Sequence, residues 1–307
     1  MKKLKVAYFG TPDFSVPALE LLYNHSQVEL VSVISMPDRK AGRGYQIKSP
    51  EVIEFAKTHK IPFFQTQNIN QEQAFLASLD DVDVFVVLAF AQFLNDKVLA
   101  IPKRGAFNIH TSLLPKYRGA APIQYALLNG DTITGVSIQK MVKKMDAGDI
   151  ACSHELSIGD SETGGQLYTR LKFQAALCLN DFISNLIKNQ IEFSPQDETQ
   201  VSFAPTLTRD DGKIDFHKPA ETIRNQVRAL SPWPGTYCEL NGKRLKVFEI
   251  SVEQKKLAPG ELDISSGEIL VGTLTQTVRL AEVQLEGKKR SSDRQLLNGI
   301  KTEVKLR

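Results

Sequence analysis

The first two-thirds of the chain alternate short, continuous apolar runs with longer amphipathic stretches. The apolar runs are residues 4–9, 28–34 and 84–89, with weaker candidates at 107–109, 134–138 and 150–156. Apolar residues recur at helical spacing in residues 16–23 and 50–59. A strand that is apolar along its whole length must be buried on both faces, as in a parallel sheet covered by helices. We therefore predict an α/β fold with a Rossmann-like, doubly wound and mostly parallel sheet.

The pattern changes in the last third of the chain. A long helix predicted over residues 163–188 closes the first domain, and a polar segment with two prolines, 189–206, reads as a linker. Beyond it a helix is expected at 219–230, followed by short strands between turn signals, of which Asn241-Gly242 is the strongest hairpin signal. We predict a first domain over 1–188, the linker over 189–206, and a smaller OB-like β-barrel over 207–307.

Several classes of protein are disfavoured by length and composition. The longest apolar run, residues 84–91, is far shorter than the roughly 20 residues of a membrane helix, so we expect no membrane association. Cys152, Cys178 and Cys238 are odd in number and widely spaced, which predicts neither a disulfide framework nor a metal cluster and suits a reducing cytoplasm. His110 and His154 show no ligand spacing with them, so no metal site is expected.

The charge is unevenly distributed. The chain carries a formal net charge of +3, and residues 201–307 hold 18 Lys and Arg against 14 Asp and Glu. This excess fits either a polyanionic partner or an ordinary solvated surface. The lone tryptophan, Trp233, is expected to pack in the core rather than to stack on a base.

The first strand does not lead into a nucleotide-binding loop. It ends in Gly10-Thr11-Pro12-Asp13, where a dinucleotide-binding domain would carry G-x-G-x-x-G, and the sequence contains no Walker motif. Redox chemistry and nucleotide hydrolysis therefore lose support.

Polar residues with catalytic potential gather in two segments. Asn108 and His110 alternate along one predicted strand, so both point to the same face near the strand end, where ligands bind in open α/β sheets. Asp146 and Asp149 lie in a turn that follows another predicted strand, from where a carboxylate can orient His110. The alternatives are a structural histidine and ordinary turn chemistry.

The same residues belong to a longer series of motifs. These are GTPDFSVPALE at the N-terminus, PDRKAGRG at 37–44, the run N-x-H-x-S-L-L-P-x-x-R-G that starts at Asn108, D-x-G-D from Asp146, DDGKIDF at 210–216, RALSPWPGTY at 228–237 and EGKKRSSDRQLLNG at 286–299. In this order they resemble the formyltransferases that use 10-formyltetrahydrofolate, and in particular those acting on initiator methionyl-tRNA, over nearly the whole chain.

The resemblance implies a reaction and assigns roles to residues. The α-amino group of methionine on initiator tRNA takes the formyl group of 10-formyltetrahydrofolate, with Asn108, His110 and Asp146 in the catalytic positions and no metal required. The folate-binding turn corresponds to Ser112, Leu113, Leu114 and Pro115. A basic loop, 37–49, would enter the acceptor stem of the tRNA through Arg39, Lys40, Arg43 and Lys48. A cytoplasmic monomer is expected.

Two departures from the family pattern and three alternatives remain. Ala91 stands where the family more often has glycine, in the predicted wall of the folate pocket, and Val142-Lys143-Lys144 replaces a more acidic and apolar approach to Asp146. The same folate chemistry could act on a small amine, such as a glycinamide ribonucleotide or an amino-sugar nucleotide, or release formate. The chain could also be a catalytically silent RNA-binding protein. The basic loop and the C-terminal barrel favour tRNA, and the intact Asn108, His110 and Asp146 favour an enzyme.

Overall fold

A computed structural model describes residues 3–41, 46–300 and 305–306 of the chain. They form two compact units. The first comprises Met1–Gly119, Thr134–Ser157 and Tyr168–Phe203, and the second comprises Ala120–Ile133, Ile158–Leu167 and Ala204–Arg307. The second unit thus also draws on two short segments from the N-terminal part of the sequence. The predicted division at residues 188 and 207 stays a prediction.

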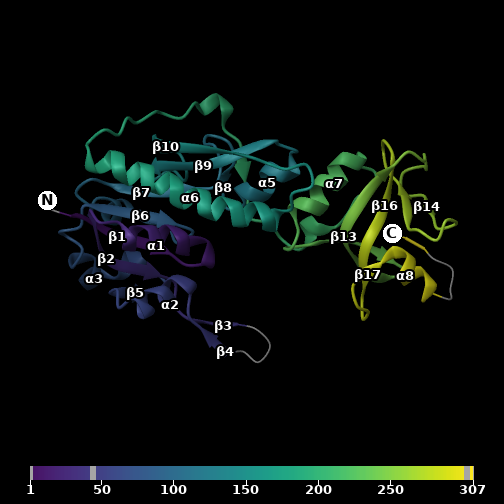
Figure 1. Ribbon diagram of the computed structural model, residues 1–307, viewed down its shortest axis with the longest axis horizontal. Coiled ribbons are helices and arrows are strands. Elements are labelled where there is room, and N and C mark those ends of the chain that lie inside the picture. Colours follow the sequence, from purple (N-terminus) through teal and green to yellow (C-terminus); the bar gives the residue numbers. More distant parts are fainter. Residues whose placement is uncertain (1–2, 42–45, 301–304, 307) are drawn as a thin grey trace. The chain divides into compact units, whose positions relative to one another are not determined.

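The first unit is built on a seven-stranded sheet with the order β10-β9-β7-β6-β1-β2-β5 (Figure 1). Its strands are β1 (Leu4–Gly10), β2 (Val28–Ser35), β5 (Phe63–Gln65), β6 (Val84–Leu88), β7 (Ala106–His110), β9 (Ile133–Lys140) and β10 (Ile150–Ser157). The five strands from β7 to β5 pair in parallel, and β9 runs antiparallel to β7. The predicted mostly parallel α/β sheet is confirmed, and its order reverses between β1 and β6, where such sheets place ligands.

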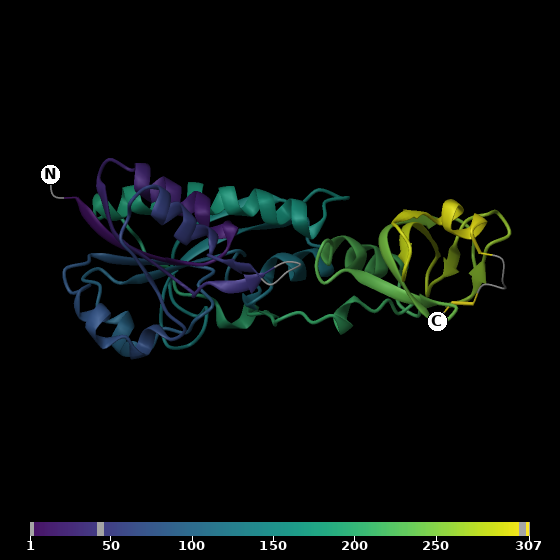
Figure 2. The same cartoon turned by 90° about the horizontal axis from the view of Figure 1, so that it is seen from below.

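Helices cover both faces of this sheet (Figure 2). One face packs on α1 (Val16–Asn24) and α6 (Gly164–Ile187), and the other on α3 (Gln73–Ala77) and α4 (Asp96–Leu99). The alternation of strand side chains produces the two layers. Phe107 of β7 packs on Phe182 of α6, with ring centroids 4.7 Å apart. The next residue, Asn108, therefore points to the opposite face.

Shorter elements connect this framework. They are β3 (Arg39–Ala41), β4 (Gln46–Lys48), α2 (Glu51–Thr58), β8 (Arg118–Gly119) and β11 (Phe203–Ala204). The strands β3 and β4 form an antiparallel hairpin that the periodicity did not predict, because strands of three residues are too short to show an apolar alternation.

The second unit is rich in β-strands. Its elements are α5 (Pro122–Leu128), α7 (Ala220–Ala229), β12 (Thr236–Leu240), β13 (Lys243–Glu253), β14 (Leu262–Asp263), β15 (Leu270–Gly272), β16 (Thr277–Leu285), β17 (Ser291–Ser292) and α8 (Asp293–Asn298). The six strands form one antiparallel sheet. Asn241 and Gly242 both have positive φ, at 50° and 72°, in the predicted hairpin turn. The β-rich C-terminal fold is confirmed.

The expected burial of Trp233 is wrong. Its side chain is 55% exposed, and it lies in the segment between α7 and β12. The core of this unit is instead filled by aliphatic residues such as Ile223, Leu245 and Leu280.

None of the helices among the described residues combines the length and the apolar character needed to cross a bilayer.

Ala91 adopts a left-handed backbone conformation, with φ at +64°. This conformation favours glycine, because the Cβ of any L-residue is crowded there. The family's usual glycine at this position therefore has a backbone reason, and the chain accommodates alanine at some cost in conformational energy.

Replacing Ala91 with glycine is expected to stabilise the fold. Relief of about 1–2 kcal/mol of backbone crowding exceeds the about 0.4–1 kcal/mol that glycine's larger unfolded-state entropy removes. The free energy of unfolding, measured by urea denaturation, should rise by about 0.5–1 kcal/mol. Ala100→Gly is the matched control, since exposed Ala100 has φ at −86° and gains nothing from glycine. A loss of stability in Ala91→Gly would contradict this account.

Candidate active site

Asn108 and His110 lie at the carboxyl end of β7, on the sheet face opposite α6. The ends of the parallel strands β1, β6 and β7 share this edge. His110 is only 6% exposed, and Asn108 is partly buried. An amide and an imidazole thus sit side by side at the edge where α/β sheets bind ligands.

Asp146 reaches these residues from the loop between β9 and β10. Its Oδ1 accepts hydrogen bonds from Asn108 Nδ2 at 3.3 Å and from Gln139 Nε2 at 2.9 Å. Its Oδ2 accepts one from the backbone N–H of Gly119 at 2.9 Å and lies 3.8 Å from His110 Nδ1. The structure therefore brings the three predicted catalytic residues together.

The loop that carries Asp146 is tightly constrained. Asp146 has φ at +50°, a left-handed conformation that aspartate tolerates better than most residues. Two residues later, a Cβ on Gly148 would meet the carbonyl oxygen of Lys140 at 1.7 Å, so only glycine fits. This close approach holds the loop against β9 and aims the carboxylate at β7.

The hydrogen bonds of His110 fix the tautomer of its neutral ring. Nε2 lies 2.9 Å from the carbonyl oxygen of Tyr117, and because a carbonyl can only accept, Nε2 carries the proton. The lone pair of neutral His110 is then on Nδ1, on the side of Asp146. This nitrogen can accept a proton, and the carboxylate 3.8 Å away stabilises the resulting imidazolium.

A second layer of polar residues, absent from the sequence-based site, holds Asp146. Gln139 donates to Asp146 and accepts from the backbone N–H of Gly148 at 3.2 Å. Gln196 donates to the carbonyl oxygens of Asp146 and Gly148, and its own oxygen accepts from Arg118. Gln139 was detectable as a polar residue in an apolar strand, whereas Gln196 lies in the predicted linker and gave no signal.

An ion pair anchors this layer. Arg118, 2% exposed, lies 2.8 Å from Glu198, which also pairs with Lys144 at 2.8 Å. These two cations lower the pKa of Glu198 to about 2, so the carboxylate stays ionised throughout the range in which proteins work. Arg118 belongs to the motif that starts at Asn108. Through its hydrogen bond to Gln196, it helps to position the loop that carries Asp146.

Gln139→Met should slow turnover without unfolding the chain. Methionine keeps the volume, but the carboxylate of Asp146 and the N–H of Gly148 each lose a partner. A displacement of the Asp146 carboxylate by about 1 Å costs up to about 10²-fold in rate. We therefore expect kcat to fall about 10–100-fold, with a smaller change in KM. Steady-state kinetics checks this, with exposed Gln71→Met as the control. Unchanged kcat would remove Gln139 from the positioning layer.

The predicted folate-binding turn follows β7 directly. Ser112 donates to the carbonyl oxygen of Lys116 at 2.6 Å, and Ser137 of β9 joins the turn by donating to Ser112 O at 2.8 Å and accepting from Leu114 N at 3.1 Å. Ser112 and Leu114 are buried, while Leu113 and Pro115 are partly exposed. These hydrogen bonds hold the turn in place directly after the strand that carries Asn108 and His110. Its role in binding folate stays a prediction.

Three of the four predicted tRNA-contacting residues, Arg39, Lys40 and Lys48, lie on the β3–β4 hairpin. Arg39 pairs with Lys48 across the strands, and Arg39, Lys40 and Lys48 are all exposed. Lys48 contacts Glu51 at 2.7 Å. Arg43 lies outside the described residues. The hairpin presents cationic side chains to solvent, which suits a contact with a polyanion.

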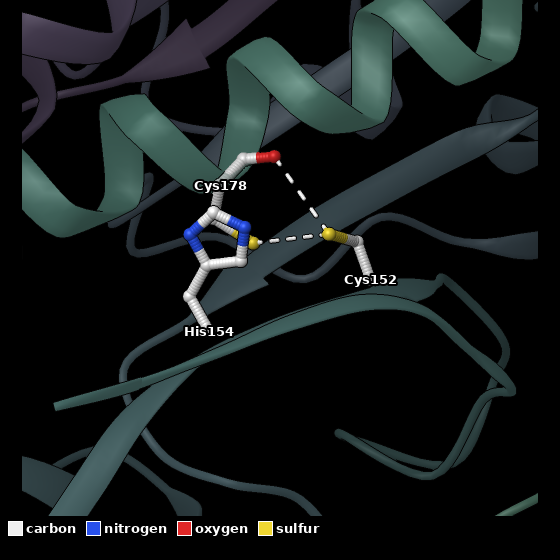
Figure 3. A group of neighbouring side chains, drawn as sticks. All are labelled: Cys152, His154 and Cys178. Atoms are coloured by element: carbon white, nitrogen blue, oxygen red, sulfur yellow. Dashed lines mark hydrogen bonds between the residues drawn. The ribbon is translucent and has the colours of Figure 1, made fainter.

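The sequence spacing predicted no metal cluster, but the structure brings two of the three cysteines and His154 together. Cys152, His154 and Cys178 converge, with one potential ligand atom from each lying within 4.8 Å of the others (Figure 3). The spacing gave no indication, because Cys178 is on α6 while the other two are on β10. Cys238 is buried in the core of the other unit.

Fold and site together define a two-part transferase in which an Asn–His–Asp constellation sits at the carboxyl edge of a doubly wound sheet. Family models confirm this class: one described as formyl transferase matches residues 2–183, and one described as formyl transferase, C-terminal domain, matches residues 206–301. The chain belongs to the formyl transferase family.

The relatives of the chain are more specific. It is 36% identical over 310 residues to the methionyl-tRNA formyltransferase of Geobacter metallireducens, covering 100% of this chain and 99% of that one. It is 38% identical over 305 residues to that of Staphylococcus epidermidis, covering 98% and 97%. Among solved structures, an N-formyltransferase from Helicobacter canadensis with folinic acid and dTDP-3-aminofucose has the same fold (TM-score 0.67, 22% identity, 91% and 98% covered).

Proposed function

We propose that this chain transfers the formyl group of 10-formyltetrahydrofolate to the α-amino group of methionine on initiator methionyl-tRNA, for translation initiation. The observation that carries the proposal is the convergence of Asn108, His110 and Asp146 in a chain that aligns from end to end with methionyl-tRNA formyltransferases. We place the reaction in the cytoplasm and expect a monomer.

The donor set of the site fits a formyl group. Asn108 Nδ2 has two N–H groups, and its hydrogen bond among the described residues, to Asp146, uses one of them. The second can donate to a carbonyl oxygen as negative charge develops on it. The folate supplies an activated one-carbon unit, and formyl transfer from it needs no metal at the reacting atoms.

The attacking amine must lose a proton, and His110, with Asp146 beside it, is placed to accept that proton. Nδ1 of His110 holds the lone pair and faces Asp146, so it can take this proton directly or through a water molecule. Asp146 stays fixed by Gly119 and Gln139 while the charge on the ring changes. Preorganised donors and a fixed carboxylate lower the barrier because they need no reorganisation during the reaction.

The deciding experiment is a formylation assay with 10-formyltetrahydrofolate and four acceptors: initiator methionyl-tRNA, elongator methionyl-tRNA, free methionine and an amino-sugar nucleotide. Binding of the tRNA is measured alongside. Transfer to initiator tRNA alone is expected. Transfer to a small amine, such as an amino-sugar nucleotide, but not to tRNA would overturn the substrate and keep the chemistry. Binding of tRNA without any transfer would favour a silent RNA-binding protein.

Arg43→Ala is expected to weaken productive tRNA binding. If Arg43 contacts a phosphate, its loss lowers kcat/KM for tRNA and reduces the slope of log affinity against log salt by about 1. If it contacts a base, the mutant also accepts elongator tRNA more readily. Kinetics at several salt concentrations distinguish the two contacts, with Lys97→Ala as an exposed control on α4. Unchanged tRNA kinetics would remove Arg43 from the interface.

A further inference from the structure

The cluster of Cys152, His154 and Cys178 lies where β10 packs against α6 (Figure 3). Cys152 and His154 are two residues apart on β10, so both side chains point to the face covered by α6, which contributes Cys178. The intervening Ser153 points the other way and lies 3.1 Å from Ser137. The edge strand β10 and the helix α6 thus bring two thiols and one imidazole, all of them potential metal ligands, to one place.

The distances between the potential ligand atoms suit a metal ion with tetrahedral coordination. The sulfur atoms of Cys152 and Cys178 are 3.5 Å apart, too far for a disulfide bond. A Zn²⁺ ion with bonds of about 2.3 Å to sulfur and about 2.0–2.1 Å to nitrogen holds its ligand atoms about 3.5–3.8 Å apart. The three ligand atoms of the cluster, within 4.8 Å of one another, lie near this geometry, and the amide of Gln174, 3.2 Å from His154 Nδ1, would have to turn away if that nitrogen binds the ion.

The residues around the cluster add a negative charge and leave one side of it open to solvent. Asp181 Oδ2 lies 3.1 Å from His154 Nε2, on the next turn of α6 after Cys178. Such a carboxylate fixes the ring and adds negative charge beside a cation. The thiol of Cys178 is buried, but the His154 side chain is 24% exposed, so solvent reaches the cluster from the side of the imidazole.

The two thiols contact each other in the reduced chain. Cys178 donates its S–H to the sulfur of Cys152 at 3.5 Å, and Cys152 donates its own S–H to the carbonyl oxygen of Cys178 at 3.9 Å. Metal ligation requires thiolates, so a bound cation would displace both thiol protons.

We propose that Cys152, Cys178 and His154, with Asp181 beside the ring, form a Zn²⁺ site that ties the edge strand β10 to α6. The ligand set, two thiolates and an imidazole, is that of zinc sites with one open position. The cluster lies on the face of the sheet that α6 covers, whereas Asn108 and His110 point to the opposite face, so the ion would not touch the reacting atoms.

The test uses the full chain, reduced and stripped of metal. Titration with Zn²⁺ against a chromophoric chelator should give one ion per chain, and Co²⁺ in its place should show thiolate-to-cobalt charge transfer. Cys152→Ser and Cys178→Ser should each weaken binding by more than about 100-fold, because a ligand matters more than its outer partners, whose loss costs about 10–100-fold. Asp181→Asn, at an exposed position, should fall within that smaller range.

Two matched controls come from the second unit: Cys238→Ala and His217→Gln should leave Zn²⁺ affinity unchanged. The proposal is overturned if the reduced chain takes up no Zn²⁺, or if Cys152→Ser binds it as tightly as the unchanged chain. It is also overturned if air oxidation joins Cys152 to Cys178 while the reduced protein ignores the metal. These readouts do not depend on formylation activity, so failure here leaves the proposed function intact.

Discussion

Asn108→Ala should lower kcat for formyl transfer by about 10²–10³-fold, the usual effect of removing one donor to an oxyanion. Asn108 is placed for this role by β7, which aims its amide away from Phe107 and α6 and toward the ligand edge of the sheet. The loss should appear in kcat, because the donor acts on charge that develops only in the transition state. Single-turnover formylation of initiator methionyl-tRNA measures it directly.

The control for this variant is Asn185→Ala. Asn185 is exposed on α6 and is distant in sequence from Asn108. The Asn185→Ala variant should retain full activity. Because Asn108 also donates to Asp146, circular dichroism and thermal unfolding must first establish that the Asn108→Ala variant is folded. Near-normal turnover of a folded Asn108→Ala protein would exclude the amide from catalysis.

Asp146→Asn should be of comparable or larger effect, with kcat lower by about 10²–10⁴-fold, the range of general acid–base contributions. The carboxylate accepts from Asn108, Gln139 and Gly119 on its two oxygens. An amide has the same shape but only one acceptor oxygen, so its NH₂ group faces a donor. A protonated His110 also loses the negative charge 3.8 Å from Nδ1.

Asp149→Asn provides the matched control, because Asp149 lies in the same loop but is exposed. It removes the same charge three residues away without touching His110. We expect its activity to stay within about twofold of the unchanged chain, the range of surface substitutions. Equal defects in the two variants would mean that loop charge, and not the position of Asp146, governs the rate.

The elements that periodicity predicted are those with a strong local signal. The runs at 4–9, 28–34 and 84–89 became β1, β2 and β6, and the helix predicted over 163–188 is α6 (Gly164–Ile187). β1 and β6 are buried along almost their whole length, and the helix-spaced apolar positions of α6 are buried as its pattern indicated, but β2 is fully buried only in its second half. The hairpin β3–β4 and the short helices α3, α4 and α5 had too few residues for a period to be read.

What the sequence by itself determined is the class of fold, the hairpin at Asn241-Gly242 and the identity of the catalytic candidates. These follow from alternation, turn chemistry and motifs, which are local properties of the chain. Only the tertiary structure decided that Asp146 meets His110, that Gln139 and Gln196 hold it, and that Cys152, His154 and Cys178 converge. Such contacts join residues many positions apart, and their geometry depends on how strands and helices pack, which no local pattern records.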